Sequence, residues 1–168
     1  MTAEVMEGRF KAVMLAAADL LKPLGFKKRG KTFRRAAHGN VELIEFQRSL
    51  TNTDNSLKFT VNIGIVSSRL AQDRELDLSK AGSADAHLRQ RIGSFLPIPH
   101  DRWWDLAGNG SEDLTISEIL PLLTERVVPY LHEHSSDAAL IQLWETGQSP
   151  GLTARLCERY LSTLKLAA

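Results

Sequence analysis

Hydrophobic and polar side chains alternate strictly between Leu57 and Val66, which is the pattern of a β-strand with one apolar face. The odd-numbered positions of this stretch are all apolar, and the even-numbered ones are Lys, Thr, Asn, Gly and Val. Two shorter stretches, 31–35 and 41–49, also read as strands. The pattern predicts a sheet with one face on the core and the other face polar or only partly covered.

A period of three to four residues replaces this alternation toward both ends of the chain. Residues 3–22 are predicted to form an amphipathic helix that ends before Pro23. In the last third we expect a helix from Thr115 or Ser117 to about His134, one from Ser136 or Asp137 to about Gly147, and one over 151–165. Pro121 is tolerated if it lies in a first turn, whereas Pro129 would kink or split its helix.

Further extended segments lie between the two helical regions. Residues 87–96 and 102–106 read as strands, and the polar stretch 69–86 as a loop or a marginal helix. Strands that are grouped, instead of alternating with helices, indicate an antiparallel sheet. We therefore predict one α+β domain over 1–168, with an N-terminal helix (3–22), an antiparallel sheet of four to five strands (26–107) and C-terminal helices (115–165) packed on one face.

Composition places the chain among ordinary folded proteins. Of its 168 residues, 43% are hydrophobic and 24% are charged, so a core of normal size forms without a disulfide or a metal. The single cysteine, Cys157, falls in a helical pattern and is expected to be a buried, inert thiol, which fits a reducing compartment. No apolar stretch is long enough to cross a membrane, and no leader is visible. We therefore expect a cytoplasmic protein without membrane contact.

Positive charge is concentrated near the N-terminus. Seven cations and no acid occur within residues 22–35, namely Lys22, Lys27, Lys28, Arg29, Lys31, Arg34 and Arg35. One interpretation is an anion-binding surface, for nucleic acid among other ligands. The other is a solvated strand and loop, because Phe26 and Phe33 are expected in the core and leave no aromatic side chain to stack on bases.

Polar positions of the predicted strands give a second candidate surface. Trp103 and Trp104 are adjacent, so on a strand one faces the core and the other the opposite side or its rim. Alternation brings to that side the positions Glu45, Gln47, Thr60, Asn62, Arg89 and Arg91. We predict a binding surface at Gln47, Asn62, Arg91 and Trp103, suited to a peptide loop or a small anion. A hydrated sheet face without a ligand is the alternative, and a one-residue slip in register would invert the faces.

Three stretches of the sequence resemble one bacterial family, the domain of unknown function 4304. They are the run from Leu21 to Arg35 (LKPLGFKKRGKTFRR), then FQRS at 46–49, and FTVNIGI at 59–65. The resemblance implies an antiparallel sheet with helices and brings no established activity. It also singles out four residues in the family's polar strand positions, Gln47, Ser49, Asn62 and Gly64. A structural role is one interpretation of these positions: Asn62 would bond a neighbouring backbone, and Gly64 would mark a bulge.

No known catalytic or metal motif is present, so we nominate no catalytic residue, metal or cofactor. His132 and His134, two residues apart on a helix, point about 200° away from each other and cannot share a metal there. The sequence favours a non-enzymatic domain that binds another protein, in the manner of an immunity or accessory protein. The alternatives are nucleic-acid or anion binding through residues 22–35, and a small-ligand enzyme that uses the polar sheet face.

Overall fold

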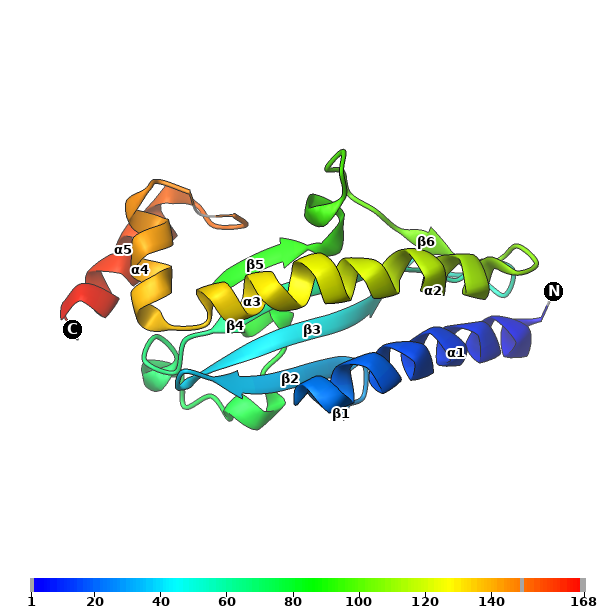
Figure 1. The fold of residues 1–168 in the computed structure, drawn as a ribbon, viewed down its shortest axis with the longest axis horizontal. Helices are drawn as coiled ribbons and strands as arrows, with labels where there is room; N and C mark the ends of the chain where they lie inside the picture. The colour runs from blue at the N-terminus through cyan, green and yellow to red at the C-terminus, as the bar shows by residue number, and fades with distance from the viewer. Residues whose placement is uncertain (1, 149, 167–168) are drawn as a thin grey trace.

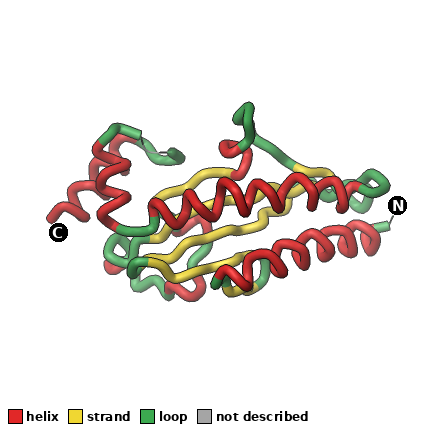
Figure 2. Tube along the Cα trace, viewed as in Figure 1, coloured by secondary structure: helices red, strands yellow, loops and turns green. Residues whose placement is uncertain are grey.

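Helices cover one face of an antiparallel sheet in the computed structural model, which describes residues 2–148 and 150–166 (Figures 1 and 2). The strands are β1 (Lys27–Arg29), β2 (Thr32–Ala37), β3 (Asn40–Arg48), β4 (Lys58–Val66), β5 (Leu88–Arg91) and β6 (Trp104–Asp105). They pair in the order β1-β2-β3-β4-β5, and β6 pairs with the start of β4. The predicted α+β class is confirmed, with one strand more than expected because β1 carries only exposed basic side chains and no apolar signal.

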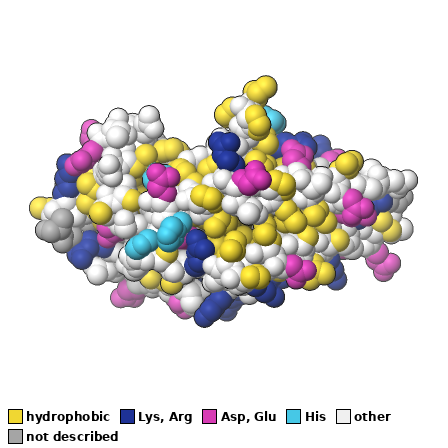
Figure 3. All heavy atoms as spheres, viewed as in Figure 1, with side chains coloured by type: hydrophobic (Ala, Val, Ile, Leu, Met, Phe, Trp, Pro, Cys, Tyr) yellow, Lys and Arg dark blue, Asp and Glu magenta, His cyan; other side chains and the backbone are white. Residues whose placement is uncertain are grey.

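The helices are α1 (Ala3–Leu21), α2 (Ser111–Leu122), α3 (Val128–His134), α4 (Asp137–Glu145) and α5 (Ala154–Leu166). Helices α1 and α2 lie side by side on the sheet, and hydrophobic side chains gather along the seam between them (Figure 3). Helices α4 and α5 lie beyond one end of the sheet (Figure 1).

Strand β4 carries the alternation that the sequence predicts. Phe59, Val61, Ile63 and Ile65 are all buried in the main core, which also takes residues from every α-helix. Their neighbours on the strand face the other way. The two-residue period therefore assigned both faces of the central strand correctly.

A segment between β4 and β5 crosses the second face of the sheet. It contains three short 3-10 turns, Gln72–Arg74, Leu78–Lys80 and Ser83–Asp85, in the stretch predicted as a loop or marginal helix. Its alanines cover one end of the sheet and form a small second core of Val41, Leu43, Val66, Ala71, Ala81 and Ala86. Gly64 lies under this segment, because a Cβ there would come within 2.7 Å of the Ala86 side chain. The predicted bulge is wrong, since Gly64 keeps regular pairing with Leu43 and Arg89.

The prediction of strand 87–96 is wrong in its second half. Strand β5 ends at Arg91, and Ile92–Phe95 forms a 3-10 turn. The chain then returns so closely that a Cβ on Gly93 would lie 1.9 Å from the carbonyl oxygen of His100. This close approach needs glycine and ends the strand.

Helix α2 begins at Ser111, four residues before the earlier of its two predicted starts. Gly110, in a left-handed conformation (φ 71°), precedes it without a side-chain cap. Pro121 therefore lies inside the helix and not in its first turn. A π-turn, Leu123–Val127, joins α2 to α3, and Pro129 falls in the first turn of α3, so the two helices continue as one rod (Figure 1).

Buried polar side chains fix the junction between α3 and α4. The amide nitrogen of Asn40 donates to the carbonyl oxygen of Ser135 (2.8 Å) and to Oδ1 of Asp137 (2.9 Å). Oγ of Ser67 donates to the same Asp137 oxygen (2.8 Å). Nδ1 of His38 lies 2.6 Å from Oγ of Ser135, which is fully buried and donates its hydroxyl hydrogen to the carbonyl oxygen of His132. The contact between His38 and Ser135 therefore has a structural role at this junction.

Candidate functional site

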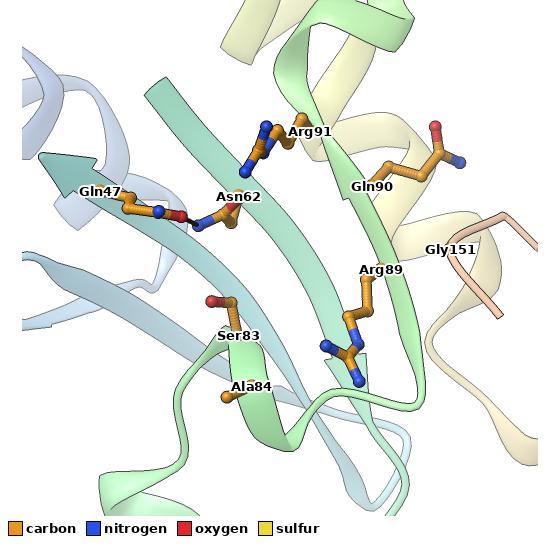
Figure 4. Close-up of a pocket in the computed structure, with 8 residues that line it drawn as sticks. All are labelled: Gln47, Asn62, Ser83, Ala84, Arg89, Gln90, Arg91 and Gly151. Carbon is orange, nitrogen blue, oxygen red and sulfur yellow. Dashed lines mark hydrogen bonds between the residues drawn. The ribbon is translucent and has the colours of Figure 1, made fainter. Parts of the chain in front are cut away.

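The uncovered part of the second sheet face carries polar side chains from β3, β4 and β5. Asn62 pairs with Glu45 on one side and Arg91 on the other, so its side chain lies between those of the two neighbouring strands. Nδ2 of Asn62 donates to Oε1 of Gln47 at 2.7 Å (Figure 4). Asn62 therefore bonds a side chain, whereas a bond to the backbone was predicted. Among the described residues, the Gln47 amide nitrogen and the Asn62 carbonyl oxygen have no hydrogen-bond partner, so both can bind a ligand.

Arg91 joins this amide pair to Trp103. Its guanidinium lies 5.2 Å from the centre of the Trp103 ring, and its Nη1 lies 2.8 Å from Oδ2 of Asp101. The Trp103 indole N–H donates to the same oxygen at 3.1 Å. Burial opposes ionisation of Asp101, but the hydrogen bonds from Trp103 and Arg91 outweigh it and lower the pKa of this carboxyl. The four residues predicted as a binding surface are therefore neighbours in space.

The two tryptophans face opposite sides, as predicted. Trp104 is buried in the core, and its indole N–H donates to Oε2 of Glu118 at 3.0 Å. Hydrogen bonds from Arg102 and Trp104 lower the pKa of Glu118. Oγ1 of the buried Thr60 donates to the carbonyl oxygen of Arg102 (2.7 Å). These contacts fix the segment before β6 that presents Trp103, and they remove Thr60 from the polar positions open to a ligand.

A hollow of about 350 Å³ opens on this face (Figure 4). Its lining comprises Gln47, Asn62, Ser83, Ala84, Arg89, Gln90, Arg91 and Gly151. Within the described chain, Arg89 makes no ion pair and no side-chain hydrogen bond, so its guanidinium is available. Three of these residues, Ser83, Ala84 and Gly151, have no signal in the sequence, since only tertiary packing of the crossing segment and of the loop after α4 brings them here.

A loop of residues 96–101, which we call the tip, projects between β5 and β6 (Figure 1), and its Asp101 contacts both Arg91 and Trp103. Ile98 lies in the middle of this loop in sequence and has 81% of its surface exposed, and several hydrophobic side chains are visible on the projection in Figure 3. Pro97 and Pro99 flank it. The backbone N–H of His100 donates to the carbonyl oxygen of Gly93 (3.3 Å), which closes the loop at its base. The tip is therefore restricted in conformation although it is exposed.

The basic segment of residues 22–35 does not form one surface. Alternation along β1 and β2 sends Lys27, Arg29 and Arg34 to the second sheet face, where they line one hollow. Lys22, Lys28 and Lys31 line another beside α1. Arg35 is committed to a buried ion pair with Glu42, at 2.7 Å. Phe26 and Phe33 are in the core, as predicted.

The other residues that the sequence analysis singled out make contacts within the fold. Cys157 is buried in the core, as predicted. Nδ1 of His134 contacts the carbonyl oxygen of Tyr130 (2.9 Å), whereas the His132 ring lies beside His38. Ser49 follows the end of β3, and its hydroxyl contacts that of Thr51 (2.9 Å). Across the residues that the structure describes, no group of three or more His, Cys, Asp or Glu is arranged to hold a metal, and no helix is long and apolar enough to span a membrane.

Comparison with known proteins gives a family and no activity. The model of a family described as a domain of unknown function (DUF4304) matches residues 17–133, which include all six strands and the four residues of the predicted binding surface. No curated protein matches the chain, and neither does any solved structure. The match covers more than half of the chain. The chain therefore belongs to the domain of unknown function 4304 family.

Proposed function

We propose that this chain is a non-enzymatic domain that binds another protein through the tip and the polar sheet face beside it. We call this surface the docking face and define it by Gln47, Asn62, Arg89, Arg91, Ile98 and Trp103. The observation that carries the proposal is the exposed Ile98, held between two prolines on a tip whose Asp101 contacts both Arg91 and Trp103.

Restriction of the tip favours binding. Proline fixes its own φ and limits the residue before it, so the tip loses less conformational entropy when a partner immobilises it. Arg and Trp are the side chains that most often dominate the binding energy of protein interfaces. An exposed aliphatic side chain on a loop that contacts such a pair has the composition of an interface centre.

The charges of the docking face indicate the chemistry of the partner. Arg89 has no acidic partner among the described residues, and Arg91 shares Asp101 with Trp103. Asn62 and Gln47 add one acceptor and one donor that have no partner in the described part of the chain. We expect the partner to present an apolar pocket for Ile98 and a carboxylate for the hollow beside Arg89. An immunity protein that binds a toxin, or an accessory protein of a larger assembly, is the specific version of this proposal.

Capture of the partner by matched variants tests the proposal. The tagged chain is purified from its native host as wild type, Ile98→Asp and Leu166→Asp. Leu166 is similarly exposed (87%) but lies on α5, away from the docking face. We expect a stoichiometric protein that co-purifies with wild type and Leu166→Asp and is lost with Ile98→Asp. Equal recovery with both variants, or no stoichiometric protein with wild type, would contradict the proposal.

A second candidate function is the binding of a small anionic ligand, or of an enzyme substrate, in the hollow itself. The concave shape of the hollow and its two arginines favour it, because small-molecule sites are concave and hold a few convergent polar groups. Thermal unfolding with a panel of small carboxylates and phosphates, on wild type and Asn62→Ala, tests it. Stabilisation of wild type that Asn62→Ala lacks, without a loss of its own stability, would favour the ligand over the protein partner.

Nucleic-acid binding through residues 22–35 has less support, because β1 and β2 send the cations to opposite sides of the sheet. Backbone recognition of nucleic acid needs a continuous basic surface, and its affinity falls steeply with salt. Retention on duplex and single-stranded oligonucleotides at two salt concentrations measures this directly. If retention falls with salt, and if Lys27→Glu and Lys28→Glu weaken it equally, nucleic-acid binding through residues 22–35 would be supported.

A further inference from the structure

A second hollow lies on the same sheet face, on the other side of the crossing segment. Ser83 and Ala84 of that segment line the first hollow, whereas Leu78 and Ser79 line the second. The second hollow has a volume of about 820 Å³. It is bounded by β1, by β2 and by the turn between β2 and β3. The crossing segment thus separates two sites on one face, and the docking face uses only the first.

Four cations line this second hollow; one of them, Arg35, is paired with Glu42, and the other three lie close together at its rim. Lys27 and Arg34 are directly opposite each other in the antiparallel β1–β2 pair, and Arg29 lies on the same face two residues from Lys27. Like charges directly opposite across strands are destabilising. Burial lowers the pKa of Arg34, and the charge of Arg29 lowers it further, against the opposing effect of Glu45. The hairpin therefore retains a repulsion that an anion would relieve.

The donors of these cations are largely unused. Nε of Arg34 donates to the carbonyl oxygen of Ala81 at 2.6 Å, which orients the guanidinium and leaves its two terminal nitrogens without a partner in the described chain. Neither Lys27 nor Arg29 forms an ion pair or a side-chain hydrogen bond there. Asp77 is close enough to Arg29 for its pKa to be affected, but its main partner is Ser79. No Asp or Glu of the described residues lines the hollow itself.

The inner wall of the hollow is apolar. Ala36 and Val41 lie opposite each other on β2 and β3, and Leu78 of the crossing segment adds a third aliphatic side chain. Small-molecule sites typically have volumes of roughly 300–1,000 Å³, with apolar walls and a few charged groups that orient the ligand. This hollow combines a basic rim and an apolar wall at that size.

We propose that this hollow binds an organic phosphate of mononucleotide size, with the phosphate at Lys27, Arg29 and Arg34 and the apolar or aromatic body against Val41 and Leu78. Three cations with free donors match the charge and the several oxygens of a phosphate, whereas one arginine fork satisfies a carboxylate. A nucleic-acid strand fits less well, because the neighbouring cations Lys28 and Lys31 lie toward the opposite side of the sheet.

Isothermal titration with four named compounds tests the proposal. The compounds are ATP and AMP, adenosine as the body without phosphate, and tripolyphosphate as charge without the body. We expect ATP and AMP to bind, and adenosine and tripolyphosphate to bind at least about tenfold more weakly, because each lacks one half of the interaction. Failure of ATP and AMP to bind, or equal binding of tripolyphosphate and ATP, would overturn it.

Two double variants with the same change in charge locate the site. Lys27→Glu/Arg29→Glu alters the rim of the hollow, and Lys28→Glu/Lys31→Glu alters the other side of the same exposed hairpin. We expect the first to weaken ATP binding at least about tenfold and the second to change it by less than about threefold, since loss of charge-assisted contacts acts locally. Equal weakening by both would show binding to general positive charge and reject the site.

The Tm of the protein without ligand tests the repulsion between these cations independently. If the rim is destabilised by repulsion, Lys27→Gln/Arg29→Gln should raise Tm by about 1–2 °C, and Lys28→Gln/Lys31→Gln should not. A lower Tm for the first variant than for the second would contradict the repulsion on which the proposal depends.

Discussion

Protonation of one buried histidine is expected to destabilise the fold in mild acid. His87 is only 3% exposed, and its ring packs edge-on against Tyr160. The backbone N–H of Ser67 donates to Nδ1 of His87 at 3.1 Å, so this nitrogen carries no proton in the folded state. Burial, and after it the charges of Arg74 and Arg89, lowers the pKa of His87 from its ordinary value of 6.5 to about 4.

The size of the effect follows from these two pKa values. Because the folded-state pKa lies below the unfolded one, the unfolded chain takes up a proton first as the pH falls. The stability linked to His87 is therefore complete above about pH 6.5 and is lost progressively toward pH 4. Between pH 7.5 and 5.0, this single group should lower the free energy of unfolding by about 2 kcal/mol, with a limit of about 3 kcal/mol at lower pH.

Urea unfolding of wild type and His87→Asn at the two pH values isolates this contribution. Asparagine keeps an acceptor for the Ser67 N–H but does not titrate, and the other histidines and the carboxylates are common to both proteins. We expect wild type to lose about 2 kcal/mol more than His87→Asn between pH 7.5 and 5.0. An equal loss in the two proteins would refute the assignment of the acid sensitivity to His87.

Two further predictions concern buried contacts of the sheet. Arg35→Ala should lower the free energy of unfolding by about 3–5 kcal/mol because it leaves the buried Glu42 carboxylate without its partner, and Arg35→Ala/Glu42→Leu should recover most of that loss in urea unfolding. If Arg35→Ala/Glu42→Leu is no more stable than Arg35→Ala, the unpaired carboxylate of Glu42 is not the cause of the loss. Gly64→Ala should cost about 1–3 kcal/mol because its Cβ meets Ala86, and Gly64→Ala/Ala86→Gly should be more stable than Gly64→Ala alone. A double variant no more stable than Gly64→Ala would show that the nearby Leu88 carbonyl dominates the clash.

The alternation of apolar and polar residues along the strands made the sheet and the candidate surface predictable. The side chain of every second residue in a strand faces the same way, so the alternation in β4 fixed both of its faces. Gln47, Asn62 and Arg91 follow the same rule on three neighbouring strands, which is why they are neighbours in the structure. Register was set by burial of the apolar face, because a slip by one residue would expose Phe59 and its neighbours.

Contacts between distant parts of the chain explain what the sequence did not predict. The end of β5 depends on the carbonyl of His100, seven residues beyond Gly93, and no local pattern encodes that approach. The start of α2 follows Gly110, in a left-handed conformation, whereas Thr115 and Ser117 have the side chains that usually cap helices. Gly151 reaches the first hollow only because the loop before α5 packs on the backbone of Arg89.

Charge clustering in the sequence was a weaker guide to the spatial arrangement of side chains than strand alternation. The seven cations of residues 22–35 are contiguous in sequence, but β1 and β2 distribute them to two sides of the sheet and commit Arg35 to Glu42. Three of the seven cations, Lys27, Arg29 and Arg34, lie close together on the second sheet face. The sequence thus indicated a concentration of positive charge without its distribution over the two sides of the sheet.

Hydrogen exchange of the purified complex with its protein partner tests the central claim most directly. If the docking face binds the partner, backbone amides of residues 89–91 and 96–103 exchange more slowly in the complex, and those of α5 exchange as in the free chain. Protection confined to the helix-covered side, over α1 and α2, with residues 96–103 unchanged, would contradict the claim.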